Sequence, residues 1–216
     1  LAVLGSVLAA FKASALFAVS GDPGQADFQV QEITRTDGCL SHESIRQAGG
    51  QLIWQARDRI LAWGGGAVEE VSAAIAPTVR AISAAHQAAA YAVYDPQTRR
   101  YALFYGEGEV PTNGGAAPEG RALVLQLQGA QPAWCRWTRQ PDACGLYSAH
   151  ASVPGVYLCD RHNSGMVFLL DKAATTDAVN VGAAEAIDWA WVSGELPSPF
   201  AGRRTAVAMV RALAQP

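Results

Sequence analysis

The four cysteines are the first residues in this 216-residue chain whose type suggests chemistry. Cys39, Cys135, Cys144 and Cys159 contain no CxxC spacing, which argues against zinc ribbons and thioredoxin-like redox motifs. The simplest interpretation is a set of reduced, buried thiols, because an unpaired cysteine packs as a small apolar side chain. A bridge between Cys135 and Cys144, closing a short loop in an oxidising compartment, is the alternative.

A denser polar cluster surrounds the last of these cysteines. The run CDRHNSG places Cys159, Asp160, Arg161 and His162 next to one another, where they could bind a ligand or supply a nucleophile. The same run is typical of a hairpin turn, because Asp and Asn side chains bend the chain and a following Gly permits the return. We therefore expect a turn here rather than a site.

Known catalytic and nucleotide-binding motifs are absent from the sequence. It contains no GxSxG, HExxH, GxxxxGK[ST] or GxGxxG, and its four histidines form no HxH or HxxxH pair. The carboxylate pairs Glu69/Glu70 and Glu107/Glu109 fall in loop-like or edge positions, so we expect solvated charges rather than acid–base catalysts. The sequence thus predicts a non-enzymatic protein with no catalytic residue, no cofactor and no metal site.

Charge excludes further classes of function. Sixteen basic against nineteen acidic residues give a net charge of -3, which disfavours a basic nucleic-acid binder or a polybasic membrane-surface protein. Two arginine pairs, Arg99-Arg100 and Arg203-Arg204, could contact phosphate, but the acidic balance of the chain speaks against that role. In the opening stretch 1–21, the apolar run before Lys12 is too short to span a bilayer, so we expect this stretch to form two strands rather than a membrane span. The missing initiator Met suggests a fragment of a longer chain.

A recurring hairpin pattern organises the chain. Pairs of apolar runs, rich in aromatic or β-branched residues, flank polar or Gly-containing turns. The expected hairpins cover 7–21, 51–65, 89–106, 121–138 and 155–172, with a last strand at 187–195 and a possible return at 205–213. The turns fall at 57–59, 95–98, 129–132 and 163–165. Residues 106–121, rich in Gly and Pro, are expected to form an exposed loop.

One segment has a different periodicity. Val71, Ile75, Val79 and Ile82 recur at helical spacing, and Pro77 stands where a helix would begin. We expect one or two helical turns that cross between neighbouring units of the fold.

These hairpins predict an all-β fold. Their spacing of roughly 40 residues, with four short strands per unit, is typical of β-propeller blades. We therefore expect a single propeller-like domain over residues 1–216, with a sandwich or jelly roll as the competing architecture. The six Trp, six Tyr and six Phe residues mostly occupy alternating strand positions, which indicates packing within and between blades rather than stacking on sugars or bases.

Several short sequence patterns resemble those of virion proteins from tailed bacteriophages. The likeness is sharpest over residues 8–82 and covers Gly38-Cys39, Ser41…Ser44-Ile45, Leu52-Ile53-Trp54, Ile60-Leu61-Ala62-Trp63-Gly64 and Val71-Ser72…Ile75. The family is that of β-propeller tail hubs and packaged-DNA-stabilisation proteins.

The resemblance implies a structural role without catalytic residues. It implies a tail or head-to-tail junction component in the virion, assembled in the bacterial cytoplasm, which forms a ring with copies of itself. Other tail or connector proteins would be its neighbours, with passive contact to packaged DNA and none to a membrane.

Two other functions remain open. One is a carbohydrate- or receptor-binding propeller whose loop aromatics, such as Tyr105 or Trp137, hold a glycan. The other is a propeller hydrolase or lyase that depends on loop carboxylates such as Glu107 or Asp160.

Overall fold

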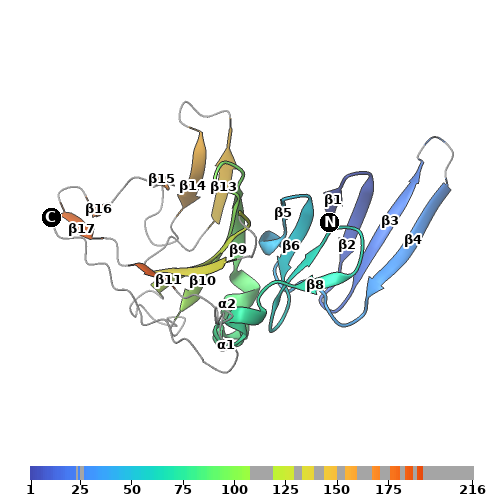
Figure 1. The fold of residues 1–216 in the computed structure, drawn as a ribbon, viewed down its shortest axis with the longest axis horizontal. Coiled ribbons are helices and arrows are strands. Elements are labelled where there is room, and N and C mark those ends of the chain that lie inside the picture. The colour runs from blue at the N-terminus through green and yellow to red at the C-terminus, as the bar shows by residue number, and fades with distance from the viewer. Residues whose placement is uncertain are drawn as a thin grey trace, which may run out of the picture.

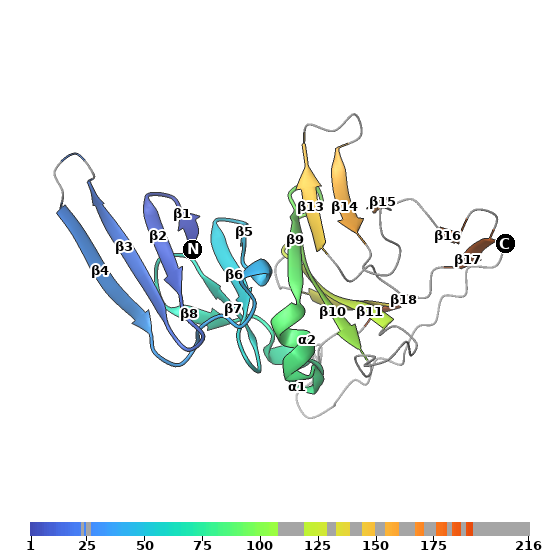
Figure 2. The same cartoon turned by 180° about the vertical axis from the view of Figure 1, so that it is seen from behind.

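The computed structural model describes residues 1–22, 24, 27–107, 119–128, 133–138, 144–149, 154–159, 167–170, 176–180, 183–186 and 189–191. Most of these residues lie in antiparallel β-strands and few lie in helices, which confirms the predicted all-β class. The first three sheets follow one another along the long axis of the molecule, and β13 and β14 of the fourth sheet lie above β10 and β11 of the third (Figures 1 and 2).

The first two sheets are four-stranded meanders, in which each strand pairs with the next along the chain. The first sheet contains β1 (Ala2–Leu4), β2 (Val7–Phe11), β3 (Leu16–Asp22) and β4 (Asp27–Thr34). A 3-10 turn, η1 (His42–Ser44), leads into the second sheet. This sheet contains β5 (Arg46–Ala48), β6 (Gln51–Gln55), β7 (Ile60–Trp63) and β8 (Val68–Glu70).

The third and fourth sheets continue the same meander pattern. The third contains β9 (Tyr91–Asp95), β10 (Arg100–Glu107), β11 (Glu119–Gln126) and β12 (Ala133–Thr138), with β18 (Trp189–Trp191) added beside β12. The fourth contains β13 (Cys144–Ser148), β14 (Gly155–Cys159) and β15 (Val167–Leu169). A two-stranded ribbon of β16 (Thr176–Asn180) and β17 (Ala183–Ala186) follows.

The four sheets are stacked face to face, so the second and third are apolar on both sides. In the second sheet, Trp54 packs toward the first sheet while its neighbour Ile53 packs toward the third. In the third sheet, Leu103 faces the second sheet and Phe104 faces the fourth. A sheet covered on both faces requires nearly continuous apolar strands, as in LIW and ALFY.

The first strands of successive sheets are neighbours in space. Strand β5 contacts both β1 and β9, and β9 in turn contacts β13. These first strands begin at residues 2, 46, 91 and 144, so successive sheets begin 44, 45 and 53 residues apart, which is longer than the expected repeat of roughly 40 residues. Successive meanders are aligned by their first strands.

The grouping of hairpins differs from the sequence-based expectation. The hairpins at 89–106 and 121–138 belong to one sheet, because β10 and β11 pair from Arg100↔Gln126 to Glu107↔Glu119. The predicted strand at 187–195 is represented by β18, which joins this same sheet. The hairpin spacing alone predicts two separate units where the structure has one sheet.

The boundaries of other predicted segments also differ from those in the structure. The apolar opening forms three strands, β1 to β3, rather than two. Strand pairing takes up both ends of the segment expected as a loop at 106–121, and residues 108–118 lie outside the described residues. The expected turns at 129–132 and 163–165 and the possible strand at 205–213 lie outside them too. In the described ranges, no helix is long and apolar enough to cross a membrane.

The predicted helical crossover joins the second sheet to the third. It consists of η2 (Ala73–Ile75), α1 (Ala76–Ala81) and α2 (Ala84–Ala89). Pro77 stands in the first turn of α1, and the Ser83 side chain caps α2 by accepting a hydrogen bond from the His86 amide. Val79 and Ile82 are buried in the core between the two sheets, which confirms the helical periodicity.

Candidate functional site: the serine junction and the apolar end faces

The structure places the carboxylate pair Glu69/Glu70 at the edge of a sheet. Glu69 and Glu70 lie on β8, the edge strand of the second sheet, and both are exposed. Glu70 lies 4.0 Å from the Arg59 guanidinium, at the limit of an ion pair. Glu107 ends β10, and its partner Glu109 lies outside the described residues.

Of the other polar groups singled out in the sequence, some lie outside the described residues and one supports a sheet. Residues 160–165 and the pair Arg203-Arg204 lie outside the described residues. Arg100 donates a hydrogen bond to Gln126 Oε1 across the β10–β11 ladder at 2.7 Å, so it supports the sheet. Within the part of the chain that the structure describes, no three His, Cys, Asp or Glu side chains gather as a metal site would require.

The cysteines are all free thiols, but they are not all buried. Cys135 packs into the core between the third and fourth sheets. Cys144 is exposed on the opposite face of the fourth sheet, so the alternative Cys135–Cys144 bridge is not formed. The cross-strand partner of Cys144 in the β13–β14 ladder is instead Cys159.

A group of three buried serines connects the second sheet to its neighbours; we call Ser41, Ser44 and Ser72 the serine junction. Ser41 Oγ donates to the carbonyl of Ala90, at the entry to the third sheet. Ser72 Oγ accepts a hydrogen bond of 2.8 Å from the Ile60 amide. Buried hydroxyls need such partners, and their directionality fixes how neighbouring segments align.

Ser44 lies at the centre of this junction. Its hydroxyl donates to the Ser41 carbonyl at 2.7 Å and accepts from the Gln55 amide at 3.1 Å. Its carbonyl accepts a hydrogen bond of 2.9 Å from the Tyr101 hydroxyl, which comes from the third sheet. Burial raises the pKa of Tyr101, so this hydroxyl stays protonated and continues to donate.

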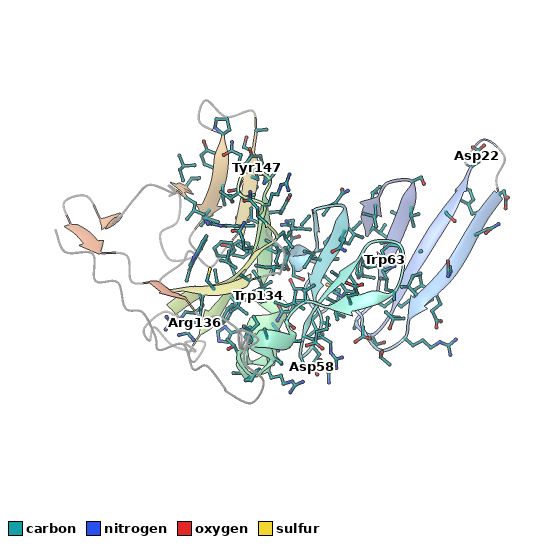
Figure 3. All side chains as sticks on the ribbon, viewed as in Figure 1. Asp22, Asp58, Trp63, Trp134, Arg136 and Tyr147 are labelled. Atoms are coloured by element: carbon teal, nitrogen blue, oxygen red, sulfur yellow. The ribbon has the colours of Figure 1, made fainter. Side chains whose placement is uncertain are left out.

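Two indole groups add further links between sheets. Trp134 of β12 donates its Nε1–H to the Val71 carbonyl at 2.8 Å, which ties the third sheet to the crossover segment. Trp54 donates to the Gly38 carbonyl at 3.1 Å, and its ring packs edge-on against Phe11 of the first sheet. Figure 3 shows side chains filling the spaces between the sheets, including labelled Trp63 and Trp134.

Gly38 allows two backbone segments to approach closely. The Cys39 amide donates to the Lys12 carbonyl at 2.8 Å. A Cβ atom on Gly38 would lie 2.2 Å from that same carbonyl oxygen, closer than any real contact. Only glycine fits here, because the colliding atoms belong to the backbone and cannot rotate away.

The serine junction therefore links separate segments of the fold. Its three serines lie in the sequence patterns at 38–45 and 71–75, and the Trp54–Gly38 hydrogen bond connects residues 52–54 to the first of these. Burial raises the pKa of the Cys39 thiol, which donates to the Ser41 carbonyl, so it is protonated and a poor nucleophile at neutral pH. The hydrogen bonds of the junction thus join neighbouring segments of the fold.

The outer face of the first sheet, which we call the β1–β4 end face, is exposed and apolar. Val3, Leu8, Val19 and Val30 are directly paired across all four strands, so their side chains form one row on the same side. Val30 is 67% exposed. Phe17 and Phe28 extend this face, and the Lys12 ammonium lies 5.2 Å from the Phe17 ring centre.

The outer face of the fourth sheet, the β13–β15 end face, has the same character. Leu146, Tyr157 and Leu169 form one cross-strand row, and Cys144, Cys159 and Val167 form the next. Leu146 is 58% exposed and Val167 is 63% exposed. The stack of sheets thus presents an apolar surface at each end, and contiguous exposed apolar surface commonly marks an interaction site.

Sequence reasoning did not identify the end faces. A signal was present in the strand VLAAF, whose residues are apolar on both faces. Such a strand is typical of a sheet that is buried on both sides. Distinguishing the covered face from the exposed one required knowledge of which sheets are neighbours.

Among known proteins, no family model matches the chain and no curated protein matches it significantly.

Proposed function

We propose that the four stacked sheets are consecutive blades of a β-propeller-like array in a non-enzymatic structural protein of a tailed-phage virion. Its place would be the tail or the head-to-tail junction, where it forms a ring. The observation that carries this proposal is a stack of like sheets with an apolar surface left exposed at each end.

The strand arrangement supports blades over a sandwich. In a propeller, each blade is a four-stranded meander and blades pack face to face around an axis. Here the first strands β1, β5, β9 and β13 are successive neighbours, as strands lining such an axis would be. A sandwich has two packed sheets, whereas four sheets follow one another in this chain.

The end faces support assembly into a ring. Among the described residues, the cores between successive sheets each join one apolar face to another, and the end faces continue that series. A second copy can extend it if its β13–β15 end face packs on the β1–β4 end face of the first. Such a head-to-tail contact is heterologous and closes into a ring when the rotation permits.

The virion role rests on the resemblance and on physical suitability. The sequence patterns that resemble those of phage tail proteins include the three serines of the junction, whose hydrogen bonds link sheets to one another. A net charge of -3 also suits a part that DNA passes without adhering, since phosphate binding needs clustered Lys and Arg. We expect other tail or connector proteins as neighbours.

Immunogold electron microscopy of particles from the source culture tests the virion role directly. Antiserum to this chain should label the tail or portal end of the virion. Label found only in the soluble fraction would overturn this assignment. Purified protein should also fail to retain duplex DNA at physiological salt, and strong retention would contradict passive contact.

A charged variant tests the ring separately. Val30→Asp places a carboxylate in the exposed row of the β1–β4 end face and should convert the oligomer to monomer, measured by light scattering after size exclusion. Gln29→Asp is the matched control, because Gln29 is exposed on the same strand but points to the other side. A wild-type monomer at high concentration, or equal effects of both variants, would contradict the ring contact.

The glycan-binding alternative receives no support from the residues named for it. Tyr105 is only 5% exposed and belongs to the core between the second and third sheets. Trp137 is half-buried and packs against the core on the other side of the third sheet. Neither ring lines a loop where a sugar could stack.

A further inference from the structure

Cys144 and Cys159 are brought together by strand register. They are direct partners in the antiparallel β13–β14 ladder, so both thiols point to the same face of the fourth sheet. Fourteen residues separate them in the sequence, and no sequence motif predicts their pairing. Cys144 is exposed and Cys159 is half-buried, so a small molecule in solution can reach the pair.

The spacing suits a covalent bond. Directly opposed residues of an antiparallel ladder have Cα atoms about 4.5 or 5.5 Å apart, depending on their place in the hydrogen-bond pattern. Disulfide-bonded cysteines have Cα atoms about 4.4–6.8 Å apart, so the bond can form without moving either strand. The pairing places the two thiols within hydrogen-bond reach, and partial burial together with a hydrogen bond to Cys159 raises the pKa of Cys144.

We propose that Cys144 and Cys159 form a reversible disulfide that staples the β13–β14 hairpin when a disulfide oxidant such as oxidised glutathione is present. One cysteine thiolate attacks oxidised glutathione, which forms a mixed disulfide and releases one glutathione thiolate. The other cysteine thiolate then attacks the mixed disulfide and releases the second. The pair loses two electrons and two protons in total, and oxidised glutathione becomes two molecules of glutathione.

The other two cysteines provide an internal comparison. Cys39 is held by hydrogen bonds to the Ser41 carbonyl and to the Ser44 hydroxyl, and burial raises its pKa. Cys135 is packed between the third and fourth sheets, and burial raises its pKa too. Neither is paired with another cysteine in a strand ladder, so both should remain thiols under the same treatment.

Peptide mapping of the whole purified chain tests this proposal. The protein is incubated with oxidised glutathione at mildly alkaline pH, alkylated and digested with trypsin without reduction. Cleavage after Arg139 and Arg161 isolates both cysteines in one peptide, separate from the peptides that contain Cys39 and Cys135. This peptide should be about 2 Da lighter than its reduced form, without added alkyl groups, and a thiol reductant should reverse the change.

Further digestion with chymotrypsin provides a second measurement. Cleavage after Tyr147 separates the Cys144 fragment from the Cys159 fragment unless a disulfide links them. Cys159→Ser should stop closure and leave a glutathione adduct on Cys144, while Cys135→Ser should close as the wild type does. Four alkylated cysteines, a stable adduct on wild-type Cys144, or a link involving Cys135 would each overturn the proposal. Because the pair lies on the β13–β15 end face, which the proposed ring contact would cover, the incubation uses dilute monomer, and the result does not depend on the virion role.

Discussion

The two faces of the first sheet are made by the same four strands, yet only one of them is covered. On the covered face, Ala9, Leu16 and Ala18 are buried against the Trp54 side of the second sheet. On the other face, Val3 and Val30 are exposed although they are equally apolar. The difference shows that composition alone does not decide burial within this stack. Position in the series of sheets does.

The serine junction and the end faces differ in a second way. The junction combines apolar packing with directional bonds, such as Tyr101 to Ser44 and Trp134 to Val71, which allow one alignment of the sheets. The end faces offer apolar area, which attracts a partner without specifying its angle. Inner contacts are therefore expected to govern stability, and outer contacts to govern association.

Truncation of one large residue on each face should give the largest difference in stability. Leu16→Ala removes a completely buried side chain and should lower the free energy of unfolding by about 3 kcal/mol. Val30→Ala, on the exposed face, should change the unfolding free energy of the monomer by less than about 0.5 kcal/mol. Urea unfolding followed by tryptophan fluorescence measures both. Equal losses in a dilute monomer would show that the outer face is covered.

A single added methyl group at Gly38 should destabilise the protein almost as strongly. Gly38→Ala forces a Cβ atom against the Lys12 carbonyl and should cost about 2–3 kcal/mol of unfolding free energy. Gly66→Ala is the matched control, because a Cβ atom there meets nothing within 4 Å. Thermal unfolding of both variants compares them. A Gly38→Ala protein as stable as the control would refute the close approach.

A smaller effect of opposite sign is expected at Gln55. Its side chain is completely buried beside the serine junction, and neither its Nε2 nor its Oε1 atom has a hydrogen-bond partner. Gln55→Leu replaces the unpaired buried amide with an apolar side chain of similar volume. It should therefore raise the free energy of unfolding by about 1 kcal/mol. Gln29→Leu, at an exposed position, serves as the control. Destabilisation by Gln55→Leu in urea titration would contradict this expectation.

The smallest effect on stability is expected in the solvent-exposed turn between β6 and β7. Asp58 accepts two hydrogen bonds from Arg59, at 2.9 and 3.2 Å, and this contact lowers the pKa of Asp58. The stabilisation is therefore present above the ordinary pKa range of a carboxyl group and is lost as pH falls through the folded-state value. Asp58→Asn should cost about 0.5 kcal/mol or less at pH 7, because the pair is solvated.

Unfolding titrations at pH 7 and at acidic pH check this last expectation. The variant and the wild type should become equally stable as the wild-type carboxylate takes up its proton. A difference that stays constant with pH would mean that the effect arises from turn geometry and not from charge.

Local features were predictable from the sequence. The turn at 95–98 follows from Asp95, whose carboxylate accepts hydrogen bonds from the Gln97 amide and the Thr98 hydroxyl. The crossover helices follow from the spacing of Val79 and Ile82 and from the position of Pro77. These features depend on residues within a few positions of one another, so the sequence pattern contains the information needed.

Relations between distant segments were decided only by the tertiary structure. Pairing of β10 with β11 placed two predicted hairpins in one sheet, and stacking order left Val30 exposed while it buried Ala18. Register brought Cys144 to Cys159 rather than to Cys135. The sequence by itself determined the all-β class, the hairpins and the lack of known catalytic motifs. The long-range contacts, which depend on register and on the order of the sheets, determined which surfaces remain available to a partner.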